Sequence, residues 1–92
     1  MCITFSLGYI VKSPALVAAI ADEEIQLGLR RHAEGDWGDV PQFDRDENEK
    51  SLLHGGSLFS EYRASDGTTF WVRTNESRTA TELVLPSDCI RF

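Results

Sequence analysis

The sequence has few cysteines and no long apolar run. Its two cysteines, Cys2 and Cys89, match no zinc-ligand spacing and are too few for the disulfide framework of a small secreted domain. We expect two reduced thiols, with a Cys2–Cys89 cross-link as the alternative if the terminal strands are neighbours. No stretch reaches the roughly 18 apolar residues that a membrane span needs. Lys12 and Pro14 interrupt the most apolar stretch, residues 9–22, in a way that a signal peptide does not show. The sequence therefore predicts a cytoplasmic protein that does not bind membranes.

Basic residues are also scarce in the central third of the chain. The chain of 92 residues has a net charge of −6, and residues 22–50 account for all of it, with ten acids and four bases. Such an acidic central segment repels phosphate and argues against direct binding of nucleic acid. We expect one domain spanning residues 1–92 whose partners, if it has any, are basic proteins or cations.

The pattern of apolar residues predicts an α+β fold. Residues 2–11 are typical of a strand, and Ser13 with Pro14 predicts the start of a helix. A second helix is expected at residues 22–34, where Gly28 permits a break, and a third at residues 44–54, with Leu52 and Leu53 facing inward.

Strands are expected in the second half of the chain. Residues 57–74 predict a hairpin that turns at Asp66-Gly67, and residues 80–85 predict a further strand that ends at Pro86. Helices early and strands late predict an antiparallel sheet of three to five strands, with two or three helices packed on one face.

The loop "GDWGDVP" at residues 35–41 stands out between two predicted helices. Gly35 and Gly38 permit positive φ, Asp36 and Asp39 can bond to their own backbone, and Trp37 can bury a large surface. This combination is typical of a tight link with an aromatic anchor. The alternative is an exposed Trp37 that contacts a partner directly.

Two motifs suggest chemistry but are incomplete. Asp44, Asp46 and Asn48 alternate as in a calcium loop, yet Glu49 and Gly55 occupy the positions where an EF-hand has glycine and glutamate. The stretch "HGGS" at residues 54–57 is similar to an esterase oxyanion loop, but the chain has no G-x-S-x-G nucleophile motif. We therefore expect no catalytic residues, no metal site and no cofactor.

The two histidines have no metal-binding spacing. His32 and His54 are 22 residues apart and form no H-x-x-x-H pair. Each falls near the end of a predicted helix, where a partly charged imidazole interacts favourably with the helix dipole.

A second candidate surface lies on the predicted hairpin and the loop after it. Its residues are aromatic or cationic, and they suggest a face for stacking or anion binding: Tyr62, Trp71, Arg73 and Arg78. The competing interpretation is that these are ordinary solvent-side sheet residues whose long stems cover apolar rings.

Several stretches between residues 31 and 86 follow a familiar order: "RHAEGDWGDV", "DRDENEKSLLHGGSLFSEY", a tryptophan strand and "TELVLP". They resemble a family of small proteins from bacterial plasmids, phages and integrative elements, whose first motif is R-H-x-x-G-D-W-G-D. The resemblance implies a mobile-element setting, in which the partner would be a host or phage protein with a basic surface, and it supplies no mechanism. The chain departs from the family in "WVRTNESRT", which loses acids and gains Arg73 while keeping Arg78, and at Ser57, where the family has arginine.

Three functions remain open from the sequence. The first is a non-enzymatic inhibitor of a host defence system, such as a CRISPR effector or a restriction enzyme, which blocks a basic nucleic-acid-binding surface. Its binding residues would be Asp36, Asp39, Asp44, Asp46, Glu47 and Glu49, with Trp37 holding the loop that presents them. The second is a regulatory or plasmid-maintenance protein that binds a partner through the hairpin face and forms a homodimer by its sheet edges. The third is a small enzyme or a divalent-metal-binding protein that uses Asp36, Asp39 and the acids that follow them.

Overall fold

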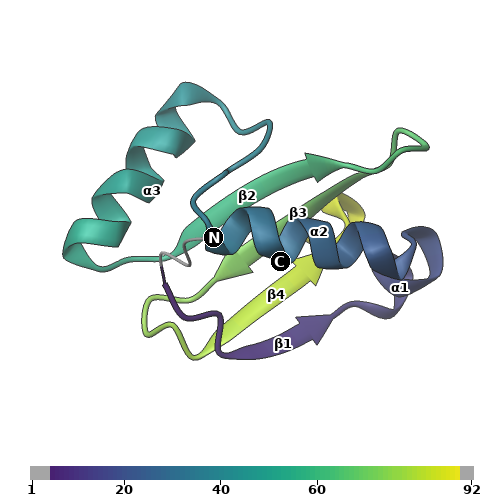
Figure 1. The fold of residues 1–92 in the computed structure, drawn as a ribbon, viewed down its shortest axis with the longest axis horizontal. Coiled ribbons are helices and arrows are strands. Elements are labelled where there is room, and N and C mark those ends of the chain that lie inside the picture. The colour runs from purple at the N-terminus through teal and green to yellow at the C-terminus, as the bar shows by residue number, and fades with distance from the viewer. Residues whose placement is uncertain (1–4, 90–92) are drawn as a thin grey trace.

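The computed structural model describes residues 5–89, and it has an α+β fold of three α-helices and a four-stranded sheet (Figure 1). The strands are β1 (Tyr9–Lys12), β2 (Leu58–Arg63), β3 (Thr69–Thr74) and β4 (Ala80–Val84). The helices are α1 (Pro14–Ala19), α2 (Asp22–Ala33) and α3 (Gln42–His54), and a 3₁₀ turn, η1 (Pro86–Cys89), follows β4. The predicted fold class is thus confirmed. Cys2 lies outside the described residues, so the Cys2–Cys89 cross-link stays an untested alternative.

The sheet has the order β1-β4-β3-β2. The predicted hairpin is present as the antiparallel pair β2 and β3, with a turn in which Gly67 has a φ of 91°. β4 continues the antiparallel part, but β1 pairs with β4 in parallel, so the sheet is mixed. The strand expected over residues 2–11 is shorter, since β1 begins at Tyr9.

Helices α1 and α2 cover one face of the sheet and enclose the main core (Figure 1). Ser13 caps α1 as predicted, because its hydroxyl accepts a hydrogen bond from the amide of Leu16, and Pro14 occupies the first turn. Helix α2 is unbroken at Gly28, where an added Cβ would lie 2.9 Å from the ring of Phe70. The core combines both helices with three strands: Leu16, Ile20, Ile25, Leu29, Tyr62, Phe70, Val72 and Leu83.

Helix α3 lies beside β2 at one edge of the sheet, apart from the face that α1 and α2 cover (Figure 1). The prediction that both leucines face inward is wrong for Leu53, which is 79% exposed, whereas Leu52 is half-buried. The single buried residue of α3 is polar, Asn48. Packing of α3 therefore depends on hydrogen bonds more than on an apolar stripe. No helix within residues 5–89 is long and apolar enough to cross a membrane.

Candidate functional site

Trp37 anchors the loop between α2 and α3. Its side chain is only 3% exposed, and its indole N–H donates to the Glu49 carboxylate of α3 at 2.9 Å. The ring packs edge-on against His32 and stacks near Phe5, with centroid distances of 5.6 and 6.2 Å. The Trp37 ring is therefore buried under the loop and is not accessible to a partner.

The same loop pairs with the edge of β2. The amide of Asp39 donates to the Glu61 carbonyl at 2.8 Å, and the amide of Glu61 donates to the Trp37 carbonyl at 3.2 Å. Gly38 lies between them with a φ of 73°, and an added Cβ there would lie 2.0 Å from the Glu61 carbonyl oxygen. This close approach explains why the motif has glycine at position 38.

Helix α3 is fastened to β2 and to the β3–β4 loop by two polar side chains. Asn48 donates to the Phe59 carbonyl at 2.7 Å and accepts from the Phe59 amide at 3.0 Å, so it replaces a missing strand partner. Arg78 donates to the carbonyls of Ser51 and Gly56, at 3.0 and 2.5 Å. These contacts fix the helix with one side against the sheet and the other toward solvent.

The acids predicted to bind a partner differ in how far their charge is already neutralised. Asp36 is exposed but pairs with Arg31 at 2.7 Å, and this hydrogen bond lowers the pKa of the Asp36 carboxyl. Arg45 is a further cation near Asp36. Glu47 forms a weaker pair with Lys50 at 3.4 Å. Asp36 is therefore largely neutralised within the protein.

The charges of the other acids are compensated less by neighbouring cations. Asp46 accepts a hydrogen bond from neutral Gln42, and Glu49 accepts one from neutral Trp37. Asp39 is exposed and Asp44 is half-buried. Successive residues of a helix are about 100° apart, so the four acids of α3 spread over roughly 220° of its circumference. They form a broad acidic surface and no narrow stripe.

Two exposed apolar side chains lie among these acids. Phe43 is 72% exposed near the start of α3, and Leu53 is 79% exposed near its end. Together they belong to the outward face of α3, which consists of Phe43, Asp46, Glu47, Lys50, Leu53 and His54. Sequence reasoning missed both apolar residues, because a leucine in a helix is usually assigned to the core. A helical projection centred on Asn48 would have placed them outside.

The structure does not assemble the second predicted surface. Tyr62 is 2% exposed and lies in the core under α2, whereas Trp71 lies on the opposite face of the sheet. On that open face the Trp71 N–H donates to Glu61 and Arg73 pairs with Glu82. Arg78 is committed to the carbonyls near the end of α3. The four residues therefore do not share a surface.

A chain of buried polar groups runs from α2 across the sheet. Thr81 donates to the Leu7 carbonyl at 2.7 Å, so its oxygen accepts from Thr74 at 2.8 Å. Thr74 must then accept from Nε2–H of His32 at 2.9 Å, which leaves Nδ1 to accept from the Ser60 hydroxyl at 2.5 Å. With a neutral His32, every hydrogen in the chain has a defined acceptor.

The expectation of a partly charged His32 at the helix end is therefore wrong. Burial, with a smaller contribution from the positive charge of Arg78, lowers the pKa of His32 from 6.5 to about 4. His32 and Ser60 are both 0% exposed, so a substrate cannot reach this serine–histidine pair. The pair is part of the core and not a nucleophilic centre.

Within residues 5–89 no group of three or more histidine, cysteine, aspartate or glutamate side chains is arranged to hold a metal ion. The chain matches no protein-family model, and searches of curated proteins and of solved structures find no match to it. Among the described residues, the outward face of α3 is the candidate site that the geometry supports best, because it exposes Phe43 and Leu53 beside charged side chains.

Proposed function

We propose that this protein is a non-enzymatic binding module that docks the outward face of α3 on a basic protein surface. The observation that carries the proposal is the exposure of Phe43 and Leu53 at 72% and 79% on a helix that also exposes Asp46, Glu47 and Glu49. Exposed apolar side chains surrounded by charged residues are typical of a protein-binding surface. Phe43 and Leu53 have such surroundings on the outward face of α3.

The arrangement favours a partner with apolar pockets flanking a cationic patch. Phe43 and Leu53 are ten residues apart, which corresponds to about 15 Å along a helix. Apolar side chains that enter pockets supply most of the affinity of an interface, whereas surrounding charges steer the encounter and select the partner. The acids between the two apolar residues suit lysine or arginine side chains.

A basic surface of this kind is what a nuclease or effector offers to nucleic acid. An acidic protein that occupies it competes with phosphate for the same cations. We therefore propose inhibition of a cytoplasmic host defence enzyme, such as a CRISPR effector or a restriction enzyme, as the biological role. The resemblance to proteins of plasmids and phages, which the motif at residues 31–40 suggests, is consistent with that role.

Direct capture with matched baits tests the proposal. The test bait changes Asp44→Asn, Asp46→Asn, Glu47→Gln and Glu49→Gln. The control bait changes Asp22→Asn, Glu23→Gln, Glu34→Gln and Glu76→Gln, which raises the net charge from −6 to −2 in the same way at other places. We expect wild type and the control to capture a nuclease or effector subunit from bacteria that express defence systems, and the test bait to lose it.

Inhibition is then measured with purified components. Cleavage of DNA by the captured enzyme should fall when wild-type protein is added, and Phe43→Ser with Leu53→Ser should relieve the inhibition. Val17→Ser serves as the control, since Val17 is also exposed, at 55%. An equal loss of capture by both amide baits would show that total charge and not the α3 face matters, and undiminished capture by the test bait would show that these acids do not contribute. Either result would overturn the proposal.

A further inference from the structure

The two edges of the sheet are treated differently. At the β2 edge, Asn48 bonds to both backbone groups of Phe59, and residues 37–39 bond to both backbone groups of Glu61. At the β1 edge, no described element lies beyond the strand (Figure 1). Tyr9, Ile10 and Val11 are 82%, 40% and 51% exposed there. An uncovered edge with apolar side chains is a template for another strand.

The backbone of β1 shows which groups remain available. The amide of Tyr9 donates to the Thr79 carbonyl at 2.8 Å, and the amide of Ser13 donates to the Leu83 carbonyl at 3.0 Å. Alternate residues of a strand direct their N–H and C=O groups to opposite sides. Residues 9, 11 and 13 thus face β4, whereas Ile10 and Lys12 direct both backbone groups outward.

We propose that the occupant of this edge is a second copy of the chain, whose β1 pairs antiparallel with the first across a twofold axis at Val11. Ile10 then faces Lys12 of the partner subunit, and Lys12 faces Ile10 of the partner subunit. Each of these pairs exchanges two backbone hydrogen bonds. A register shifted by two residues either way keeps only one such pair within β1 and, in one direction, places two lysines opposite each other. The central register is therefore favoured.

The distribution of charge permits a second copy at this edge. Two chains of net charge −6 repel each other wherever their acidic segments meet, but residues 22–50 hold the excess acid and β1 contains none. Lys12, the single charged residue of the strand, already has a carboxylate partner in Asp22, at 3.6 Å. Helix α3, with most of the binding acids, lies at the opposite edge of the sheet (Figure 1).

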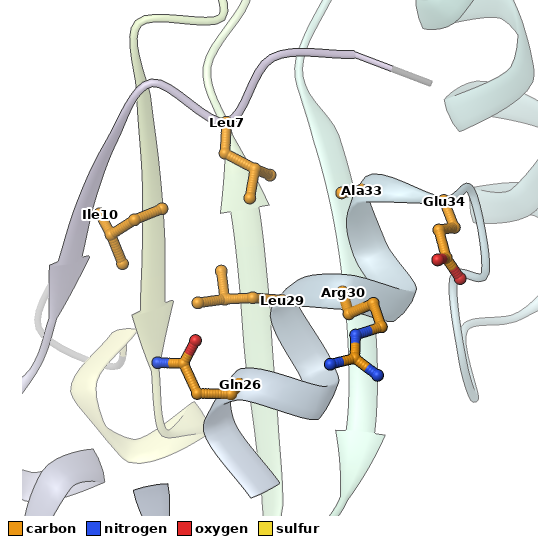
Figure 2. Close-up of a pocket in the computed structure, with 7 residues that line it drawn as sticks. All are labelled: Leu7, Ile10, Gln26, Leu29, Arg30, Ala33 and Glu34. Atoms are coloured by element: carbon orange, nitrogen blue, oxygen red, sulfur yellow. The ribbon is translucent and has the colours of Figure 1, made fainter. Parts of the chain in front are cut away.

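The surroundings of Ile10 add an apolar contact. A groove of about 340 Å³ lies between β1 and α2, lined by Leu7, Ile10, Leu29 and Ala33, with Gln26, Arg30 and Glu34 beside them (Figure 2). The side chain of Ile10 points into this groove, on the helix side of the sheet (Figure 2). In the proposed pairing, the aliphatic stem of Lys12 of the partner subunit covers Ile10 at the rim of the groove.

The geometry also limits the assembly to two chains. A twofold contact uses the same edge of both copies, so neither β1 remains free after pairing. The β2 edge is occupied by Asn48 and by residues 37–39, so it offers no second template. The result is a closed dimer with one continuous sheet of eight strands, and no filament.

Sedimentation equilibrium tests the dimer directly. Wild-type protein is examined from about 10 µM to about 1 mM, the range in which a small interface dissociates. We expect a reversible rise toward twice the mass of the chain. Val11→Lys should remain monomeric because it brings two ammonium groups together at the twofold axis, whereas Val17→Lys, at a site of similar exposure on α1, should dimerise like wild type.

Two further variants test the register and distinguish loss of the dimer from loss of the fold. Ile10→Pro removes an outward N–H but no bond to β4, so it should fold and lose the dimer. Val11→Cys, in a background with Cys2→Ser and Cys89→Ser, should form an interchain disulfide under mild oxidation, since the two Cα atoms would be about 4.5 Å apart.

Two results would overturn the proposal. One is a wild-type protein that stays monomeric up to the highest concentration, which would leave the edge for an extended peptide of another protein. The other is a dimer that Val11→Lys and Ile10→Pro leave intact while both remain folded by circular dichroism, which would place the contact elsewhere. Neither result bears on the α3 face, which the capture experiment tests separately.

Discussion

His32 makes the stability of this protein depend on pH. The folded state holds the imidazole neutral, with its pKa lowered from 6.5 to about 4. As the pH falls, the unfolded chain therefore binds this proton before the folded chain does. We expect the free energy of unfolding to decrease by about 3 kcal/mol through this group between pH 6.5 and pH 4. The stabilisation is fully present above pH 6.5.

NMR titration of the histidine ring signals, together with urea denaturation at several pH values, measures this effect. The His32→Asn variant cannot titrate in this range and should lose less stability than wild type on acidification. His54→Gln is the matched substitution at the other histidine, which is exposed at the end of α3. An imidazole of His32 that is protonated at pH 6 would contradict the neutral hydrogen-bond chain.

Gly38 is a second residue whose role can be isolated. Gly38→Ala combines an unfavourable φ of 73° with a clash against the Glu61 carbonyl, at 2.0 Å from the added Cβ. Gly67→Ala has an equally unfavourable φ of 91° but no atom within 4 Å. We expect Gly67→Ala to cost about 1 kcal/mol and Gly38→Ala to cost at least about 2 kcal/mol more.

Urea denaturation of both glycine variants gives the comparison. The difference between them measures the close approach of the loop to β2, because the conformational cost is common to both. Equal losses of stability would mean that the loop can move away from Glu61, and that the pairing of residues 37–39 with β2 contributes little.

At the level of elements, Asn48 decides how α3 is held. Asn48→Ala breaks two hydrogen bonds and leaves the amide and carbonyl of Phe59 without partners in a place that is only partly accessible to water. We expect a loss of about 2 kcal/mol, because unpaired backbone groups cost more than the net value of a hydrogen bond. Gln42→Ala, which removes an exposed bond to Asp46, should cost less than about 0.5 kcal/mol.

Hydrogen exchange distinguishes this role from general destabilisation. The Phe59 amide should exchange faster in Asn48→Ala. The exchange rates of the amides that hydrogen-bond between β3 and β4 should change only as far as the global stability changes. An unchanged rate at Phe59 would show that α3 protects the edge by coverage alone, without the side-chain bonds.

The elements differ in how far the sequence could predict them. The hairpin, the Ser13 cap and α2 follow from local signals: a Gly in the turn, a hydroxyl before Pro14, and apolar residues four apart. The parallel pairing of β1 with β4 joins residues 9–12 to residues 80–83, and no local pattern records it. The outward position of Leu53 also escaped prediction, because it follows from Asn48 reaching the edge of β2.

The candidate site was predictable only in part. Composition identified the acidic segment, and the glycines of the loop indicated a tight anchor around Trp37. The neutralisation of Asp36 by Arg31 depends on the path of the loop after α2, which the sequence does not specify. The sequence also does not specify the register between β2 and β3. This register places Tyr62 of β2 and Trp71 of β3 on opposite faces of the sheet.

At the level of the whole molecule, the two proposed surfaces lie at opposite edges of one sheet. The α3 face is acidic and adjoins β2, whereas the β1 edge is nearly uncharged. Binding through α3 gains from attraction between opposite charges. Pairing through β1 gains from backbone hydrogen bonds and apolar contact, and it works against repulsion between two chains of equal charge. Salt should therefore act on the two surfaces in opposite directions.

Both effects of salt can be measured on one preparation of the protein. Screening shortens the range of charge interactions from about 20 Å near 20 mM salt to a few ångströms near 500 mM. We expect binding to a lysine homopolymer, used as a defined basic probe, to weaken steeply over this range, and the dimer to keep or slightly raise its affinity in sedimentation equilibrium. The variant with Asp44→Asn, Asp46→Asn, Glu47→Gln and Glu49→Gln should lose more of the lysine binding than the control with four amides elsewhere, and it should still dimerise. A dimer that dissociates in salt would be held by ion pairs, to which β1 can contribute only Lys12, and this result would contradict the proposed pairing.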